Sequence, residues 1–309
     1  MVGSVESAIS LLLKRSFKEK IFSMRGKSRA AAFLLASPFL LFLSILVIWP
    51  TYLGLKTALS RDLLSEFEIT PAGLDNFRMV LEQPQFWEAL RFTIIFALSV
   101  TVLECLLGFA LALVFDRKFP GKTFLFSVTL VPIMIAPSLM AVMYRLILNQ
   151  NIGIVPGFLQ KFGIEISIFD ERYIFWTLVT LDALQYTSFA FLLIYAALQN
   201  MPSEVYESAA IDGASPRQII ARITIPILKP AIAIIAMLRL IDSFRTFDTI
   251  YIMTGGGPGT TTQTIGIHIY KTAFITGDFG MASAMSILLV MLLTPFMPFI
   301  IRQFRLDVK

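Results

Sequence analysis

The segment AAAFLLASPFLLFLSILVIWPTYLGL occupies residues 30–55 and holds no charged side chain between Arg29 and Lys56. Its 26 positions exceed the roughly 20 apolar residues that a helix needs to cross the hydrocarbon core of a bilayer. It is also longer than the apolar region of a cleaved signal peptide, which has about 7–15 residues. The stretch therefore predicts a membrane-spanning helix that stays in the mature chain.

The same pattern recurs along the sequence. Further spans are predicted at Phe92–Phe115, Thr123–Tyr144, Tyr173–Gln199 and Phe279–Ile301, in which Glu104 and Asp182 are the only charged residues. Another span is expected at Pro230–Met253, although charged residues interrupt it. The expected fold is all-α: a polytopic transmembrane bundle of about six helices.

The composition of the 309 residues agrees with this fold class. Hydrophobic residues make up 56% and charged residues 15%, with a mean hydropathy of +0.76, whereas soluble domains carry about 25% charged residues. One His and one Cys exclude a zinc cluster, a disulfide framework and a haem pair, so no metal site is expected. The apolar tracts also exceed what the core of one soluble enzyme could bury.

Lys and Arg residues in the flanking segments predict the orientation, because they are retained on the cytoplasmic side. With the N-terminus inside, the cytoplasmic segments 1–29, 116–123, 200–230 and 302–309 hold 16 basic residues, and the outer segments 56–91, 149–172 and 249–276 hold 7. We therefore expect two cytoplasmic tails, 1–29 and 303–309, around a transmembrane domain at 30–302. The net charge of +5 follows from this bias, so it does not indicate a nucleic-acid partner.

The basic N-terminal tail leaves two interpretations open. Its apolar residues recur at helical spacings, as expected of a helix that lies on an anionic lipid surface. A solvated tail that only sets the orientation is the simpler alternative.

The segment PSEVYESAAIDGASPRQIIARITIPILKP, residues 202–230, is too polar to span a membrane but is strongly patterned. Ser203 can open a helix that runs to about Asp212. Gly213 then suits a C-terminal cap, where φ is positive. The sequence predicts a short cytoplasmic helix that ends in a tight bend.

A second helix is predicted directly after the bend. Ser215 is a plausible N-cap, Pro216 falls at the first helical position, and Gln218 occupies the capping-box position. Pro226 is expected to end the apolar run that follows. Two short helices with small residues at the corner form a compact knob suited to docking into a groove of another protein.

Here the chain resembles the permease subunits of binding-protein-dependent ABC importers. The signature of that family is E-A-A, three residues, G, nine residues and I-x-L-P. It occurs here as Glu207-Ser208-Ala209, Gly213 and Ile223-Thr224-Ile225-Pro226 with both spacings intact. Ser208 replaces the first Ala of the signature and Ile225 replaces Leu; both replacements are small or isosteric.

The resemblance covers most of the chain and narrows to the carbohydrate subfamily, which includes maltose and glycerol-phosphate permeases. It is carried by residues 73–77 (GLDNF), 86–87 (FW), 104–110 (ECLLGFA), 211–214 (IDGA), 247–251 (FDTIY) and 254–258 (TGGGP). Two positions depart from the subfamily pattern. Tyr144 stands where Trp is usual, and Pro156 stands where Asn is usual. They bear on solute choice or loop shape.

The resemblance implies that segment 202–230 couples the spans to an ATPase subunit, and we call it the coupling segment. The residues implied in coupling are Glu207, Ser208, Ala209, Ala210, Asp212, Gly213, Ala214, Ile223 and Pro226. Small residues permit close backbone approach, and Glu207 can pair with a basic group of the partner. The alternative is that Glu207 is only a solvated helix residue.

The same resemblance implies a set of partners. They are a second homologous permease, two ATPase subunits (a homo- or heterodimer) and an extracytoplasmic solute-binding protein, in the bacterial inner membrane. The chain has no G-x-x-x-x-G-K-[ST] motif, so ATP and Mg are expected on the ATPase subunits, with no cofactor and no catalytic residue in this chain. The implied cargo is a sugar, oligosaccharide or polyol-like solute.

Charged residues inside the predicted spans are candidates for the solute pathway. Arg239, Asp242, Arg245 and Asp248 recur every three residues with alternating sign, so neighbours can pair while the row drifts around the helix. Such groups usually face the interior of a bundle or a wet cavity. They fit a pathway lining or a gate, or structural pairing. Further pathway candidates are Glu104, Tyr144, Asp182, Gln185 and Tyr186, although interhelical hydrogen bonding explains such residues equally well.

Two rival functions and one alternative solute class stay open. An ion-coupled secondary transporter would explain the intramembrane acids but not the patterned coupling segment. An integral-membrane enzyme would need a reactive constellation, and His268, the one histidine, lies in a predicted outer loop. A cavity lined by several basic groups would indicate an anionic cargo such as a phosphate, sulfonate or uronate.

Overall fold

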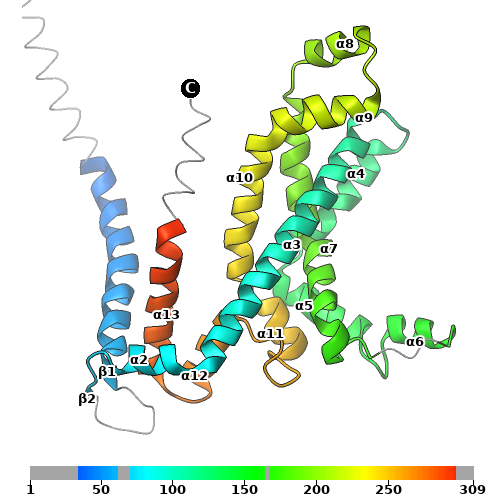
Figure 1. Ribbon diagram of the computed structural model, residues 1–309. Coiled ribbons are helices and arrows are strands. Elements are labelled where there is room, and N and C mark those ends of the chain that lie inside the picture. The colour runs from blue at the N-terminus through cyan, green and yellow to red at the C-terminus, as the bar shows by residue number, and fades with distance from the viewer. Residues whose placement is uncertain (1–33, 62–69, 164–166, 297–309) are drawn as a thin grey trace, which may run out of the picture. The chain divides into compact units, whose positions relative to one another are not determined.

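The computed structural model describes residues 34–61, 70–163 and 167–296 (Figure 1). The predicted tails, 1–29 and 303–309, lie outside these residues, and the predicted orientation of the termini stays a prediction. The chain divides into two compact units, residues 1–57 and 58–309. The described part of the first unit is helical and belongs to the 25-residue apolar helix Leu34–Ala58, so the first predicted span is confirmed as a helix.

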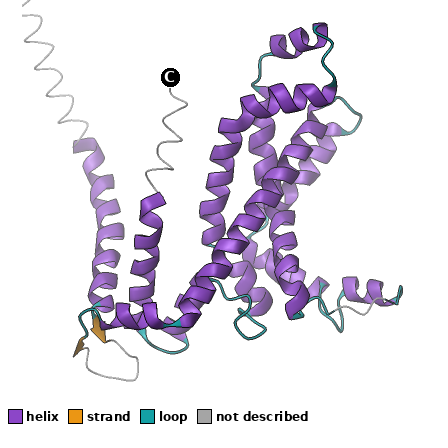
Figure 2. Ribbon diagram, in the orientation of Figure 1, coloured by secondary structure: helices purple, strands orange, loops and turns teal. Residues whose placement is uncertain are grey.

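The described residues of the second unit form helices, with one pair of two-residue strands (Figure 2). Its long apolar helices are α3 (Pro84–Asp116), α7 (Glu171–Gln199) and the continuous run Pro216–Phe244. With Leu34–Ala58, four helices among the described residues are long and apolar enough to cross a membrane. A bent pair raises this number to five. The last predicted span, Phe279–Ile301, corresponds to the shorter helix α13 (Phe279–Leu293), and its predicted end at Ile301 lies outside the described residues.

The remaining elements are short. They are β1 (Ser60–Arg61), β2 (Thr70–Pro71), α2 (Asp75–Glu82), α6 (Ile154–Gln160), α8 (Ser203–Ile211), α11 (Asp248–Thr254), α12 (Ile265–Phe274) and the 3-10 turn η3 (Thr294–Phe296). β1 and β2 pair antiparallel, with Ser60 opposite Pro71. Six of these elements, β1, β2, α2, α6, α11 and α12, lie in or at the edge of the predicted outer segments, whereas α8 lies in the coupling segment.

The third predicted span is not one helix. It consists of α4 (Lys122–Leu130), the 3-10 turn η1 (Val131–Met134) and α5 (Pro137–Ile147), and the two arms meet at a bend of 98°. Pro132 and Pro137 lack the backbone N–H that a continuous helix requires, and each stands near the start of a new element. The span predicted at Thr123–Tyr144 is therefore present as a bent pair of helices rather than as one helix.

The boundaries of the next span also differ from the prediction. The helix begins at Pro216 with α9 (Pro216–Ile219), continues through a π-helical turn at Ile220–Thr224 and ends with α10 (Ile225–Phe244). Pro226 does not end it, because the widened π turn directly before this proline accommodates its ring. The predicted end at Met253 was wrong as well, since α10 stops at Phe244 and Met253 belongs to α11.

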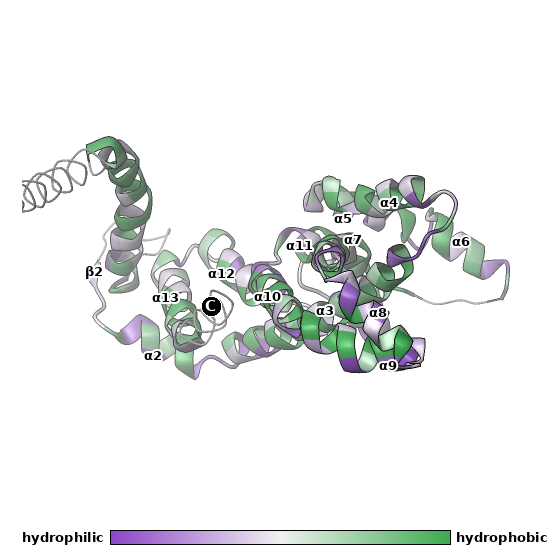
Figure 3. Cartoon of the chain, turned by 90° about the horizontal axis from the view of Figure 1, so that it is seen from above, coloured by the Kyte–Doolittle hydropathy of each residue, from purple (hydrophilic) through white to green (hydrophobic). Residues whose placement is uncertain are grey.

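The packing of α3 against α7 forms the centre of the second unit. Gly108 on α3 lies so close to α7 that a Cβ atom added there would stand 2.7 Å from the backbone nitrogen of Phe191. Phe115, Phe126 and Phe191 pack together beside this contact, with ring centroids 5.0–5.9 Å apart. Figure 3 shows hydrophobic residues (green) along α3, α10 and α13, as expected of helices in contact with lipid.

Candidate solute cavity and coupling segment

A buried cluster of ionisable side chains joins the three central helices. Arg239 of α10 donates two hydrogen bonds to Glu104 of α3, from Nε to Oε2 at 2.5 Å and from Nη2 to Oε1 at 2.8 Å. Its Nη2 also donates to Asp182 Oδ1 of α7 at 3.1 Å. All three side chains are at most 2% exposed. Sequence positions that lie far apart are thus brought together in the interior of the bundle.

Two further groups complete the surroundings of the guanidinium. Arg239 Nη1 donates to Asp242 Oδ2 at 2.6 Å, and Asp242 is half-exposed. The ring of Tyr186 lies 4.0 Å from the guanidinium carbon, as in a cation–π contact. The predicted pairing of Arg239 with Asp242 is confirmed, and four of the pathway candidates surround Arg239.

A cavity of about 180 Å³ lies beside this cluster, and we call it the Asp182 cavity. It is lined by Pro137, Asp182, Tyr186, Asp242, Arg245, Thr246, Phe247, Asp248 and Thr249. Its wall includes the stretch between α10 and α11, where regular helix is interrupted. Asp182 Oδ2 is buried and has no hydrogen-bond partner among the described residues. Asp182 therefore contributes a buried carboxylate to the lining of the cavity.

The expected four-residue row of charges is not continuous. Because α10 ends at Phe244 and α11 begins at Asp248, Arg245 and Asp248 do not extend the helical face of Arg239 and Asp242. Both are exposed and line the Asp182 cavity. The row is wrong as a helical stripe, but the structure does bring three of its members to one cavity.

Gln185 and Tyr144 lie elsewhere. The Gln185 Nε2 amide donates to the carbonyl of Ile135 at 3.0 Å, at the bend between η1 and α5. Ser188 Oγ likewise donates to the carbonyl of Thr129 at 2.5 Å. These bonds satisfy backbone groups that the bend leaves without a helical partner. Half-buried Tyr144 packs against the core formed by α3, α7 and α11 and is not among the residues that line the cavity.

The coupling segment folds largely as predicted. α8 ends at Ile211 with Asp212 as its C-cap, and Gly213 follows with φ of 74°, while Ala214 N donates to the Ala209 carbonyl at 3.0 Å. Ser215 and Gln218 form the predicted capping box, with Pro216 at the start of α9. The difference is that α9 is the first turn of the long helix that reaches Phe244 rather than a separate short helix. The bend therefore connects α8 directly to a span.

The residues implied in coupling divide into exposed and packed positions. Glu207, Ser208, Ala210, Asp212, Gly213 and Pro226 are exposed, Ala214 and Ile223 are half-buried, and Ala209 is buried. Tyr206 Oη lies 3.4 Å from Thr224 Oγ1, which links α8 to the π turn. In Figure 1, α8 stands beyond the ends of α7 and α9, away from α11 and α12. An exposed, small-residue corner is thus attached to a rigid helix.

Several residues of the cavity were not among the predicted pathway residues. Pro137, Thr246, Phe247 and Thr249 line it because the chain is interrupted before α5 and again before α11. Pro137 and the polar run after Phe244 are the sequence signals that could have located them. Within the described ranges, no group of three or more His, Cys, Asp or Glu residues is arranged to hold a metal ion.

Comparison with known proteins places this architecture in a family. Residues 104–306 match the binding-protein-dependent transport system inner membrane component family. The trehalose/maltose transport system permease protein MalF of Thermococcus litoralis is 32% identical over 275 residues, which are 88% of this chain and 93% of that protein. The chain belongs to this family of inner-membrane components. It is accordingly a multi-pass permease of an ABC-type transport system.

Two other relatives span similar lengths. The sn-glycerol-3-phosphate permease UgpA of Escherichia coli is 30% identical, with 86% of this chain and 91% of that protein aligned. The sulfoquinovosyl glycerol permease SmoG of Agrobacterium fabrum is 29% identical, with 84% of this chain and 86% of that protein aligned. A crystal structure of a bacterial ABC transporter that imports the polysaccharide alginate shares the fold, with a TM-score of 0.77 at 20% identity, covering 92% of this chain and 99% of the other.

Proposed function

We propose that this chain is a permease subunit of an ATP-driven importer that carries a neutral, hydroxyl-rich solute such as a sugar, oligosaccharide or polyol. It would act with a second homologous permease, two ATPase subunits and an extracytoplasmic binding protein. ATP and Mg would bind to the ATPase subunits, and this chain would perform no covalent chemistry. Family membership supports the transport role, and the relative named for trehalose and maltose supports a neutral sugar as the solute.

The observation that carries the solute class is the chemistry of the Asp182 cavity. Three aspartates and one arginine line it, together with two threonines and two aromatic rings. Carboxylates and threonine hydroxyls accept hydrogen bonds from sugar hydroxyls, and aromatic rings pack against the C–H faces of sugars. An excess of carboxylates disfavours an anionic solute by like-charge repulsion. The cavity therefore favours neutral cargo over a phosphate, sulfonate or uronate.

The coupling segment supports ATP-driven transport over the ion-coupled alternative. Its corner is exposed, held rigid by the capping box and by the backbone bond from Ala214 to Ala209, and continuous with the helix that carries Arg239. A displacement of α8 would therefore be transmitted along Pro216–Phe244 to the wall of the Asp182 cavity. A secondary transporter has no use for such a rigid, exposed docking element.

The proposal is tested by uptake into proteoliposomes that contain the whole transporter. The candidate solutes are maltose, trehalose, sn-glycerol-3-phosphate and glucuronate, each supplied with the solute-binding protein of the same transport system. We expect ATP-dependent uptake of a neutral sugar in preference to the two anions, and no uptake driven by an ion gradient alone. Preference for an anion would overturn the solute class, and ion-driven uptake by this chain alone would overturn the ABC assignment.

A further inference from the structure

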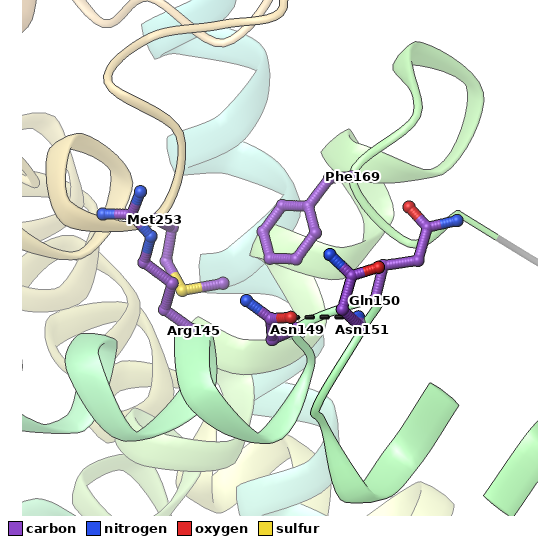
Figure 4. A pocket seen from close by; sticks show the side chains of 6 residues that line it. All are labelled: Arg145, Asn149, Gln150, Asn151, Phe169 and Met253. Carbon is purple, nitrogen blue, oxygen red and sulfur yellow. Dashed lines mark hydrogen bonds between the residues drawn. The ribbon is translucent and has the colours of Figure 1, made fainter. Parts of the chain in front are cut away.

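A second cavity, of about 260 Å³, lies outside the central cluster, and we call it the Arg145 cavity. It is lined by Arg145, Asn149, Gln150, Asn151, Phe169 and Met253 (Figure 4). Three adjacent amide side chains and a guanidinium thus meet one aromatic ring and one buried methionine. Four polar side chains and two apolar ones thus line the cavity, a lining rich in hydrogen-bonding groups.

The local hydrogen bonds orient Asn149. Its Oδ1 atom accepts bonds from the backbone N–H groups of Asn151 at 3.0 Å and Ile152 at 3.3 Å. This turn fixes the side chain and directs the Nδ2 amide group toward the space between Arg145 and Phe169 (Figure 4). The amide N–H groups are therefore presented as donors, with their geometry set by the backbone in advance of any ligand.

Arg145 and Gln150 are also held in position. Arg145 Nη1 donates to the carbonyl of Ile252 in the last turn of α11 at 3.0 Å, where the helix dipole favours a cation. Gln150 Oε1 accepts a hydrogen bond at 3.2 Å from Oγ of Ser167, which lies in the loop before α7. A guanidinium carries five N–H donors, so Arg145 keeps others for a ligand.

The two cavities share the same pair of helices. At the start of α5, Pro137 lines the Asp182 cavity, whereas Arg145, eight residues later, lines the Arg145 cavity. Along α11, Asp248 lines the first and Met253 lines the second. Eight residues of helix correspond to about 12 Å. The cavities thus lie at successive positions along the packed α5–α11 pair.

The order of the cavities along a transport path follows from α7. Phe169 lies just before the first turn of α7, Asp182 lies in its middle, and its last residue, Gln199, leads into the coupling segment. The Arg145 cavity is therefore at the end of the spans farthest from the coupling segment. A solute that moves toward the coupling segment passes the Arg145 cavity first.

We propose that the Arg145 cavity is a receiving subsite, which binds the neutral hydroxyl-rich solute before it moves along α5 and α11 to the Asp182 cavity. This inference rests on the proposed function and adds a second binding site to it. Arg145 and the amides of Asn149, Gln150 and Asn151 supply donors for hydroxyl and ring oxygens, and Phe169 supplies the apolar face. The donor-rich Arg145 cavity and the acceptor-rich Asp182 cavity are complementary in hydrogen bonding to hydroxyl groups, which both donate and accept.

The test measures protection of a cysteine by a sugar. In the whole transporter with Cys105→Ala, Asn151→Cys is labelled by a hydrophilic maleimide while maltose or trehalose, whichever is transported, is added without binding protein. We expect the labelling rate to fall about threefold or more as the subsite fills. Gln160→Cys, on exposed α6 outside the cavity, is the matched control and keeps its rate. Equal protection of both cysteines, or of neither, would overturn the subsite.

A second pair of variants separates the two cavities. Asn149→Asp keeps the Oδ atoms that accept from Asn151 and Ile152 but removes the amide donors, so the turn is preserved. We expect the sugar concentration for half-protection to rise about threefold to tenfold, the effect of one lost hydrogen bond. Asp182→Asn is expected to leave protection at position 151 unchanged and to slow uptake. An unchanged half-protection concentration in Asn149→Asp would overturn the role of Asn149.

These measurements also distinguish failure of the inference from failure of the proposed function. Normal sugar uptake with no protection at position 151 would reject the receiving subsite and leave the proposed function standing. If neither maltose nor trehalose is taken up and an anion is, the proposed solute class fails, and the subsite for a neutral solute fails with it.

Discussion

Arg239 and Glu104 form a two-point salt bridge between α10 and α3, with donor–acceptor distances of 2.5 and 2.8 Å and side chains 2% and 0% exposed. A charge in the interior of a membrane protein is tolerated only when it is paired. Asp182 from α7 shares the same guanidinium. One arginine therefore compensates carboxylates from two other helices and fixes how the three central helices pack.

Removing this arginine should destabilise the protein strongly. Arg239→Met leaves Glu104 and Asp182 buried without a cation, a change that typically costs about 3–5 kcal/mol. We expect a large fall in the thermal unfolding midpoint of the purified chain in detergent. Arg78→Met is the control, because the Arg78–Glu82 bridge is exposed on both sides and such pairs contribute little. Equal midpoints for the two variants would contradict a structural role for the cluster.

The α3–α7 contact supplies a second prediction. In Gly108→Ala, the new Cβ atom would lie 2.7 Å from Phe191 N and 3.0 Å from the carbonyl carbon of Ala190, both backbone atoms that cannot rotate away. Overpacking of this kind costs about 1–3 kcal/mol. Gly157→Ala in α6, where nothing lies within 4 Å of the added atom, should be neutral or slightly stabilising. Thermal unfolding of both variants checks this, and a stable Gly108→Ala protein would show that the helices separate easily.

The positions of the membrane spans were predictable from sequence, because they depend mainly on the free-energy cost of moving charged groups from water into hydrocarbon. The apolar stretches around Gly108 and Ala190 contain few charges, and the cost of placing charges in hydrocarbon is large enough to override local preferences. Features set by neighbouring residues were predictable too. Gly213 takes the expected positive φ, and Ser215 and Gln218 form the expected capping box. In both cases the determinants lie within a few residues of one another.

Features that depend on packing were not predictable in the same way. Pro226 was expected to stop a helix, but a π turn accommodates it, and the bend at Pro132 and Pro137 was not expected. The partners of Arg239 on α3 and α7 lie 135 and 57 positions away, and the rotation of each helix about its axis decides whether they meet. Sequence identified each charge as unusual but not which charges form the cluster.

The single histidine predicts a pH effect on stability. His268 in α12 is buried, and its Nδ1 atom lies 2.7 Å from Gln263 Nε2. The other ring nitrogen of His268, Nε2, has no hydrogen-bond partner among the described residues. Burial, and then the nearby Lys271, lower its pKa below the ordinary value of 6.5. Because His268 binds a proton more readily in the unfolded chain, protonation favours unfolding. The contribution of neutral His268 to stability is complete above about pH 6.5 and is lost as the pH falls through the lower pKa of His268 in the folded protein.

We therefore expect the unfolding midpoint to fall between about pH 7.5 and pH 5.5, and His268→Gln to reduce that fall. Gln keeps a hydrogen-bonding group near Gln263 but does not titrate. Thermal unfolding of the purified protein at both pH values gives the comparison, with the midpoint at the higher pH as the reference for each variant. An identical fall in both proteins would assign the pH dependence to other groups.

The coupling segment yields the prediction that bears most directly on the mechanism. Glu207 is exposed on α8, and the corner that follows it leads through Ser215 into the continuous helix Pro216–Phe244. Glu207→Lys reverses the charge available to a basic group of the ATPase subunit without disturbing the cap at Gly213. Because charge-assisted bonds are worth about 1.5–3 kcal/mol, we expect solute uptake per ATP hydrolysed to fall about tenfold or more.

Uptake and ATP hydrolysis are measured in the same proteoliposomes, and the amount of chain in the membrane shows that insertion is intact. Glu88 is exposed in the first turns of α3, away from the coupling segment, so Glu88→Lys is the matched charge reversal. It should leave the ratio of uptake to hydrolysis unchanged. Glu207→Gln keeps the shape and removes the charge, so an intermediate ratio would attribute coupling to the ion pair. A wild-type ratio in Glu207→Lys would mean that this corner does not carry the motion from the ATPase to the spans.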